Sequence, residues 1–387
     1  MSEIKFPIYL DHHATTPVDP RVLDEMIPYF TKKFGNASSL DHTFGYDASV
    51  AVENAREIIA NGIGARHDEI VFTSGATESD NIALIGTMNK YADRGNHLIT
   101  CVTEHKAVLD TAKHLESLGK KVTYLPVNEY GEINLQELEN AITSETVMIS
   151  IMFANNEIGT IADVKAIGEI AHKHEVIFHT DAAQAVGHIP VDVGMMNIDL
   201  MSFSAHKMYG PKGIGALYVR GVKPRVRPEG LFYGGGQERN IRSGTLNVPG
   251  IVGFGKAMEI AILEMDAENE KFKEWMDLML SEFERIGGKL NGHPTKRLPH
   301  NLNVYFKGIE SKAIINSVSK EIAISAGSAC TTQIVEPSHV LLALGLDEDT
   351  THYAIRIGVG RFNTLNEIKK TMDVILSSIE SLRKIQV

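Results

Sequence analysis

Short apolar runs alternate with helical patterns through the first two thirds of this chain of 387 residues. Short apolar runs predict strands, and longer stretches with helical periodicity predict helices. Strands are expected at 69–73, 97–102, 122–125, 147–153, 176–179 and 200–203, and helices at 78–92, 106–118, 135–141 and 164–174. Strands that alternate with helices in this way indicate an α/β fold, with a mostly parallel sheet covered by helices on both faces.

The pattern changes near residue 250, where a single helical pattern runs from Ile251 to Ile286. This long helix is expected to connect two lobes. After it, strands are expected at 302–306, 321–325 and 353–359, and helices at 312–320, from Pro337 and from Leu365. We therefore expect a large domain at 17–255, and a smaller α+β domain made of 1–16 and 256–387.

The composition argues against several classes of protein. Apolar residues make up 43% and charged residues 22% of the chain, and the net charge is −11. No dense basic patch appears, and the nearest candidate, 220–227, is expected to be a loop or an interface, so direct nucleic-acid binding is not expected. Two cysteines without a C-x-x-C pair argue against a disulfide framework and a zinc site, and favour a reducing compartment. No secretory signal or membrane-spanning run is recognised, so a cytoplasmic protein is expected.

Lys207 is the first candidate for chemistry. It follows the expected strand at 200–203 closely, and glycines and a proline come after it in the segment 204–215. A lysine held at a strand end in a dry site has a lowered pKa and becomes an amine that forms imines readily. Taken alone, this single motif is more often a surface lysine.

Asp181 comes just after the expected strand at 176–179. A carboxylate at that edge can pair with a pyridinium nitrogen, although an aspartate there is also a common helix cap. The spacing of 26 residues between Asp181 and Lys207 suits two strands joined by one crossover. We therefore expect both side chains at the same edge of the sheet.

Two further strand ends add a phosphate cup and a flat ring. Gly75, Ala76 and Thr77 join the strand at 69–73 to a helix, where free N–H groups can hold a phosphate. A simple helix cap has a similar sequence. His105 follows the strand at 97–102 and could stack on a planar ligand, although a structural histidine is the common alternative. Together, the four strand ends predict pyridoxal phosphate as the cofactor.

Over nearly its whole length, from Tyr9 to about Arg361, the chain resembles the NifS/IscS family of cysteine desulfurases, which are fold-type I pyridoxal-phosphate enzymes. The resemblance rests on the segments 9–20, 72–81, 103–110, 155–159, 204–215 and 242–245. It implies that the enzyme converts L-cysteine to L-alanine and passes the sulfur to an acceptor protein.

The resemblance also implies a role for each matching residue. Lys207 would hold the cofactor and take the α-proton, Asp181 would pair with the pyridine nitrogen, and His105 would stack on the ring and transfer protons. The other cofactor contacts implied are Asn156 and Gln184 at the ring hydroxyl and Ala76, Thr77, Ser204 and His206 at the phosphate. Thr245 would reach the phosphate of a second subunit, so a homodimer is expected.

Cys330 lies among small polar residues in the segment 325–337, whereas Cys101 lies inside an apolar strand and fits a buried, inert thiol. The resemblance makes Cys330 the nucleophile that becomes a persulfide, and it makes Arg356, with Asn156, the group that binds the substrate. A planar guanidinium suits a carboxylate. No resident metal is implied, although Cys330 could ligate an iron–sulfur cluster transiently.

The sequence departs from the family pattern in three places. Ala205 stands where a glycine is usual, Ala326 stands where a serine is common, and the acceptor-docking tail of the housekeeping members is absent after Val387. The acceptor therefore stays open among iron–sulfur assembly, tRNA thiolation and DNA phosphorothioation, as does activity on selenocysteine. Two alternatives remain: another enzyme of this fold, such as a selenocysteine lyase or an aminotransferase, and a sulfur-relay or scaffold protein without catalysis. The Cys330 loop argues against an aminotransferase, and intact Lys207 and Asp181 argue against the scaffold.

Overall fold

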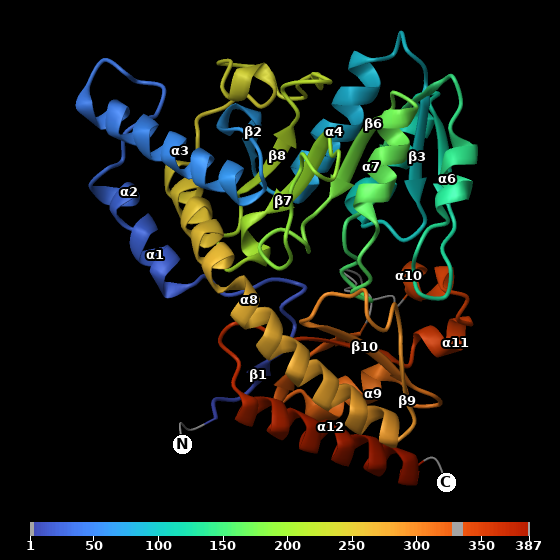
Figure 1. Ribbon diagram of the computed structural model, residues 1–387. Helices are drawn as coiled ribbons and strands as arrows, with labels where there is room; N and C mark the ends of the chain where they lie inside the picture. The colour runs from blue at the N-terminus through green and yellow to red at the C-terminus, as the bar shows by residue number, and fades with distance from the viewer. Residues whose placement is uncertain (1–3, 327–335, 386–387) are drawn as a thin grey trace.

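The computed structural model describes residues 4–326 and 336–385, and its larger part is built on a seven-stranded sheet, in the upper half of Figure 1. The strand order is β2 (Ile70–Thr73), β8 (Gly215–Val219), β7 (Leu200–Ser204), β6 (Ile177–Asp181), β5 (Thr146–Ser150), β3 (His97–Cys101) and β4 (Lys121–Leu125). Neighbouring strands from β7 to β4 are parallel, whereas β8 is antiparallel to both of its neighbours. The mostly parallel sheet predicted from the sequence is confirmed.

The short connection explains why β8 runs against the rest of the sheet. Only residues 205–214 separate β7 from β8, and they form the 3-10 turn η2 (Ala205–Lys207) and a loop. A parallel connection needs a crossover of about a dozen residues or more, usually with a helix. The chain therefore turns back beside β7.

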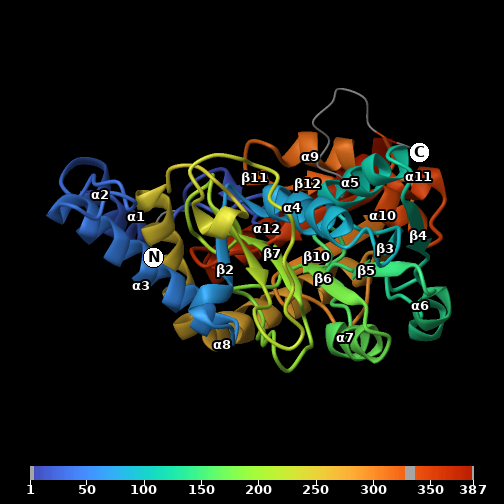
Figure 2. The ribbon, with the colours of Figure 1, turned by 90° about the horizontal axis from the view of Figure 1, so that it is seen from above.

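Helices cover both faces of the large sheet, as Figure 2 shows for α4 and α5 on one side and α7 on the other. Alternate residues of each strand point to opposite faces, so Val71 of β2 packs with α4 and α5, whereas Phe72 packs with the helices of the other face. The helices of this part are α1 (Pro20–Met26), α2 (Pro28–Thr31), α3 (Thr43–Gly62), α4 (Ala76–Lys90), α5 (Lys106–Ser117), α6 (Leu135–Ala141) and α7 (Val164–Lys173). Short 3-10 turns lie at η1 (His67–Glu69) and η3 (Glu238–Asn240).

The helix α8 (Val248–Arg285) has 38 residues and runs from the large sheet to a second core (Figure 1). Its first half contributes Phe254 to the core of the large sheet, and its second half contributes Phe272 and Phe283 to the second core. The long connecting helix predicted from the sequence is confirmed. The domain boundaries at residues 16 and 255 stay a prediction.

The second core lies against a four-stranded antiparallel sheet in the order β12 (Ser325–Ala326), β13 (Ala354–Gly358), β10 (Asn301–Phe306) and β9 (Gly288–Leu290). The helices of this part are α9 (Ser311–Val318), α10 (His339–Ala343), α11 (Glu348–Thr351) and α12 (Leu365–Ile385). The two short strands β1 (Ile8–Tyr9) and β11 (Ile322–Ala323) pair in parallel beside it. The N-terminal segment is therefore built into this half of the molecule.

Two predictions about strands need correction. The strand expected at 321–325 is two short strands, because Ile322–Ala323 pair with β1 whereas Ser325–Ala326 pair with β13. Its partner β1 lies more than 300 positions earlier in the sequence, and no local pattern announces it. The strand expected at 147–153 leaves the sheet after Ser150.

Within the described residues, the structure contains no helix that is both long and apolar enough to cross a membrane.

Candidate active site

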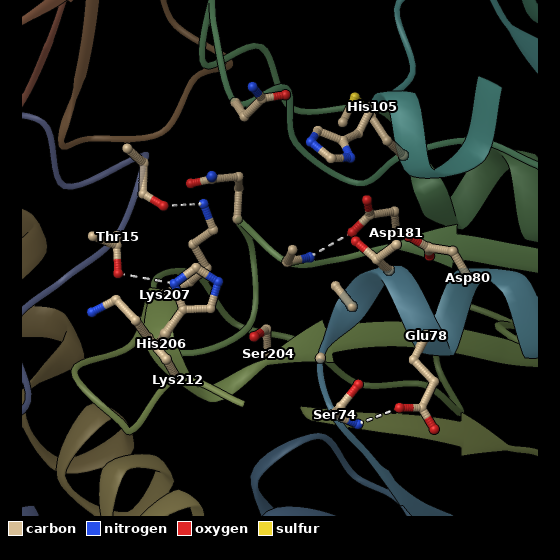
Figure 3. Close-up of a pocket in the computed structure, with 18 of the residues that line it drawn as sticks. Thr15, Ser74, Glu78, Asp80, His105, Asp181, Ser204, His206, Lys207 and Lys212 are labelled. Carbon is tan, nitrogen blue, oxygen red and sulfur yellow. Dashed lines mark hydrogen bonds between the residues drawn. The ribbon is translucent and has the colours of Figure 1, made fainter. Parts of the chain in front are cut away.

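A cavity of about 560 Å³ lies at the carboxyl ends of the large sheet's parallel strands (Figure 3). Such an edge is where ligands bind in α/β sheets, and the volume is ordinary for a site that holds a small cofactor. Ten of the residues that the sequence singled out line it. They are Gly75, Ala76, Thr77, His105, Asn156, Asp181, Gln184, Ser204, His206 and Lys207.

Lys207 follows β7 in the turn η2 and points toward the N-terminal segment. Its Nζ atom donates hydrogen bonds to the main-chain oxygens of His13 and Ala14. Burial and the charge of Arg356 lower the pKa of Lys207 to about 8, against the opposing effect of Asp181. The neutral, nucleophilic form of this amine is therefore far more abundant close to physiological pH than in an ordinary lysine.

Asp181 is the last residue of β6, the parallel neighbour of β7, and only 5% of its surface is exposed. Its Oδ1 accepts a hydrogen bond from the N–H of Ala183 at 2.9 Å. Burial raises the pKa of Asp181, whereas His105 and Lys207 lower it. A protonated pyridine nitrogen is the kind of cation that would hold this buried carboxylate in its ionised form.

Two more buried acids, Asp80 and Glu104, lie behind Asp181, and burial raises the pKa of both well above the ordinary range. The charge of Asp181 contributes to both shifts. Nε2 of His179 lies 3.6 Å from Oδ1 of Asp80, but burial lowers the pKa of His179 to about 3, so that ring is neutral. Because like charges exclude one another in a dry site, the negative charge can reside on Asp181 when Asp80 and Glu104 stay protonated.

The opposite end of the cavity is built for an anion. The helix α4 begins there after Gly75, whose φ of +155° favours glycine, and the first N–H groups of a helix have no partners within it. A Cβ atom on Gly215 would lie 2.6 Å from Cα of Gly75, so only glycine at position 215 leaves room for the backbone at Gly75. Ala76, Thr77 and Ser204 line this end, and these backbone and hydroxyl donors fit a phosphate group.

His206 and Lys212 also line the cavity and lie on the side of Lys207 in Figure 3. Burial, together with the charges of Lys207 and Lys212, lowers the pKa of His206 to about 4, so its ring is neutral. Its Nδ1 lies 3.0 Å from Oγ1 of Thr15. Lys212 is the second lysine among the residues that line the cavity.

His105 lies on the same side of the cavity as Asp181 in Figure 3, whereas Lys207 and His206 lie on the other side. It caps the helix α5, because its Nδ1 accepts a hydrogen bond from the N–H of Ala107 at 3.1 Å. Nδ1 is therefore the acceptor nitrogen, and Nε2 is left to exchange protons with a ligand. One residue therefore caps a helix and lines the cavity.

Arg356 and Thr245 are not among the described residues that line the cavity. Arg356 lies in β13 with 2% of its surface exposed; Nη2 donates to Oδ1 of Asp11 at 2.8 Å and Nη1 to the main-chain oxygen of Asn156 at 3.0 Å. It therefore lies directly behind Asn156, which does line the cavity. Thr245 is exposed.

The two cysteines differ in what the structure says of them. Cys330 lies outside the described residues. Cys101 is in β3 with 2% of its surface exposed, and burial raises the pKa of its thiol to about 11. The prediction that Cys101 is a buried thiol is confirmed.

Sequence reasoning missed several residues of this cavity, including Ala14, Thr15, Ser74, Asp80 and Lys212. Lys212 lies in the same motif as Lys207, and Ala14 and Thr15 lie in the N-terminal motif, so a signal was present without an assigned role. Asp80 carried a different signal, because this acid lies on the same face of its helix as the buried Ala83 and Leu84, three and four residues later.

The chain is similar to known proteins over nearly its whole length. The Aminotransferase class-V family pattern matches residues 8–371. The cysteine desulfurase IscS of Rickettsia africae (strain ESF-5) is 50% identical over 387 residues, which cover all of this chain and 94% of that protein. Among solved structures, a NifS-like protein has a TM-score of 0.91 at 39% identity, covering 97% of this chain and all of that one. A structure described as SspA in complex with cysteine has a TM-score of 0.81 at 39% identity, covering 92% of this chain and 99% of that one.

The family match spans nearly the whole chain, and the cavity offers a lysine, a buried aspartate and a phosphate cup in the arrangement that pyridoxal phosphate requires. The chain therefore belongs to the aminotransferase class-V family and, within it, to the pyridoxal-phosphate-dependent cysteine desulfurases.

Proposed function

We propose that this cavity converts L-cysteine to L-alanine, with Lys207 as the cofactor-bearing lysine and Cys330 as the residue that receives the sulfur. The observation that carries the proposal is the position of Lys207 and Asp181, which face one cavity from the ends of the adjacent parallel strands β6 and β7. An amine with a lowered pKa beside a buried carboxylate is the pair that a pyridoxal-phosphate enzyme needs.

When bound, pyridoxal phosphate supplies an electron-withdrawing ring that makes the α-proton of cysteine acidic. Asp181 keeps the proton on the pyridine nitrogen, and the buried acids behind it stay neutral. Lys207, once its amine is free, takes the α-proton, since its pKa of about 8 lets it hold or release a proton near neutral pH. His105 serves a second proton transfer through Nε2, because its Nδ1 is committed to the helix cap.

Binding is divided between the two ends of the cavity. Ala76, Thr77, Ser204 and His206 hold the phosphate, and Asn156 and Gln184 contact the ring hydroxyl. Arg356, with Asn156, binds the carboxylate of the substrate. Two N–H groups of Arg356 already donate hydrogen bonds to Asp11 and to the main-chain oxygen of Asn156. These contacts fix the plane of the guanidinium and leave the other N–H groups of Arg356 available.

The assignment of sulfur transfer to Cys330 rests on two observations. Ser325 of β12 pairs with Arg356 of β13, so the chain enters the segment that contains Cys330 beside the proposed substrate arginine. The other cysteine, Cys101, is buried with a raised pKa and is unsuited to attack. The thiolate of Cys330 attacks the substrate sulfur, and a sulfur–sulfur bond forms as the carbon–sulfur bond breaks. The electron pair of the broken bond stays with the carbon skeleton, which takes up a proton at that carbon and leaves as alanine.

An exposed aromatic cluster in and between α2 and α3 supports the homodimer that we propose. Phe30, Phe34, Phe44 and Tyr46 are each more than half exposed, and the rings of Phe34 and Phe44 stack at 5.3 Å. An exposed aromatic cluster of this kind is typical of an interface. Thr245 is exposed as well, so it is free to complete the phosphate site of a second copy.

The persulfide is then donated to an acceptor protein, in iron–sulfur assembly, tRNA thiolation or DNA phosphorothioation. The enzyme works in the cytoplasm, since the chain has only two cysteines and Cys101 is a free thiol.

The test compares the wild type with Cys330→Ala and Cys101→Ala after incubation with L-cysteine. Alanine is quantified, and the added sulfur is located by mass spectrometry of peptides. The proposal expects one added sulfur on the peptide that contains Cys330, normal turnover in Cys101→Ala, and loss of sulfide release in Cys330→Ala with the cofactor spectrum retained. Sulfur on the Cys101 peptide, or undiminished turnover in Cys330→Ala, would contradict it. A parallel assay with selenocysteine separates a desulfurase from a lyase for the selenium substrate.

A further inference from the structure

Three buried histidines form a stack beneath the cavity. The ring centroids of His13 and His300 are 4.6 Å apart with an interplanar angle of 21°, and those of His188 and His300 are 4.2 Å apart at 28°. Each residue is at most 5% exposed. The three come from the N-terminal segment, the link after β6 and the residue before β10, so the stack joins parts of the chain that are far apart in sequence.

Both ends of the stack contact Lys207. Nε2 of His188 donates a hydrogen bond to the main-chain oxygen of Lys207 at 2.8 Å. At the other end, the main-chain oxygen of His13 accepts one from Nζ of Lys207. That same oxygen of His13 also accepts a hydrogen bond from Nε2 of Gln184 at 3.0 Å. His13 is thus the point where the stack, the lysine and Gln184 meet.

The ring of His13 is neutral. Burial lowers its pKa far below the ordinary range, and the charges of Arg356 and Lys207 and the ring of His188 act in the same direction. A neutral imidazole carries a single N–H. Both ring nitrogens face oxygens, however: Nδ1 lies 3.0 Å from Oε1 of Gln184, and Nε2 lies 3.3 Å from the main-chain oxygen of His300. Only one of these contacts can be a hydrogen bond donated by the ring.

The surrounding contacts favour Nδ1 as the donor. The main-chain oxygen of His300 already accepts a hydrogen bond from the N–H of Val359 at 3.2 Å, so it does not depend on His13. If Nδ1 lacked a proton, Gln184 would have to turn its amide over, and its oxygen would then face the main-chain oxygen of His13 without a hydrogen between them. With the proton on Nδ1, His13 and Gln184 form two hydrogen bonds and no repulsive contact.

We propose that His13 is a positioning residue: its Nδ1–H fixes the side-chain amide of Gln184, so that the second N–H of that amide is presented to the cavity as a donor. One N–H of the amide is used by the main-chain oxygen of His13, and Gln184 lines the cavity. The inference rests on the proposed function in one respect, the contact between Gln184 and the ring hydroxyl oxygen of the cofactor. His13 acts on that oxygen only through Gln184.

This arrangement has a measurable consequence. A donor at the ring oxygen stabilises its negative charge and weakens its attraction for the proton on the linked lysine nitrogen. Without His13, the amide of Gln184 can turn over and the donor is lost for part of the time. The pH at which the visible absorbance of the cofactor changes should therefore rise in His13→Phe, by about half a pH unit or more, as expected for the loss of one hydrogen bond.

The experiment titrates the visible absorbance of the holoenzyme in the wild type, in four single variants and in one double variant. His13→Phe keeps a ring in the stack and removes Nδ1–H; Gln184→Leu removes the amide itself; and His13→Asn restores an N–H donor. His300→Phe is the matched control, because it preserves the stack and leaves the contact between His13 and Gln184 in place. The inference expects an upward shift in His13→Phe, an equal or larger upward shift in Gln184→Leu, no shift beyond that of Gln184→Leu when both are combined, and midpoints near the wild-type value in His13→Asn and His300→Phe.

An unchanged midpoint in His13→Phe, or an equal shift in His300→Phe, would overturn the inference. A second measurement needs no cofactor: the nitrogen chemical shifts of ¹⁵N-histidine-labelled apoprotein report which ring nitrogen of His13 is protonated. A proton on Nδ1 supports the inference and a proton on Nε2 overturns it, even if His13→Phe fails to fold. If the proposed function were wrong, the wild type would lack the visible band, and the tautomer of His13 would still be measurable.

Discussion

Asp181 closes β6 and Lys207 follows β7, its parallel neighbour, so that the carboxylate and the amine face one cavity from adjacent strand ends. Each charge favours the charged form of the other, because Asp181 raises the pKa of Lys207 and Lys207 lowers the pKa of Asp181. Burial opposes both effects and prevails in both residues. The buried position of the pair therefore raises the pKa of Asp181 and lowers the pKa of Lys207.

The first prediction concerns the charge of Asp181. Asp181→Asn keeps the shape of the side chain and removes its charge, so the ring nitrogen loses its partner and turnover should fall about one hundredfold, equivalent to about 3 kcal/mol. Asp181→Glu keeps the charge and should lose less. The turnover number at saturating cysteine, with the cofactor content checked by absorbance, decides the matter. Equal activity in both variants would mean that Asp181 serves only the turn with Ala183.

The second prediction concerns the pH dependence of cofactor uptake by the apoprotein. Burial disfavours the ammonium form of Lys207, so its reactive neutral form is present above a pKa of about 8. The rate at which the visible band appears should rise about tenfold per pH unit below that value and level off above it. Stopped-flow absorbance measures this rate, with Lys207→Ala as the control that cannot form the bond. A rate that keeps climbing to pH 10 would show an ordinary, exposed amine.

The third prediction uses the stability of the apoprotein. Burial raises the pKa of Asp80, so the folded chain keeps a proton that the unfolded chain releases above its own, lower pKa. The free energy of unfolding should therefore fall as the pH rises from 5 to 8, with one such group contributing up to about 1.4 kcal/mol per pH unit. Asp80→Asn should show a correspondingly flatter decline in urea unfolding. The exposed Asp110→Asn is the control for removing one acid, and an identical slope in wild type and Asp80→Asn would contradict the prediction.

Much of the fold and cavity could be predicted because strand ends carry local signals. Lys207, Asp181, His105 and Thr77 each follow a short apolar run, and the parallel sheet brings such ends to one edge. The polarity of β8 also follows from the length of its connection, once that strand is recognised.

What the sequence could not supply depends on contacts between distant segments. The main-chain oxygens of His13 and Ala14 bind Lys207 although more than 190 residues separate them, and a main-chain acceptor leaves no mark in the pattern of side chains. The strand expected at 321–325 is split for the same reason, because Ile322–Ala323 pair with the distant strand β1. The position of Arg356 behind Asn156 likewise needs the contact between β13 and the segment that follows β5.

The identity of the cofactor-bearing lysine is the most direct test of the account, because Lys207 and Lys212 both line the cavity. Borohydride should bleach the yellow holoenzyme and fix the cofactor on its lysine, and peptide mass spectrometry then locates it. The account predicts a pyridoxyl group on Lys207 alone, with Lys212→Ala labelled as fully as the wild type. A pyridoxyl group on Lys212, or no labelled lysine in a bleached sample, would contradict it.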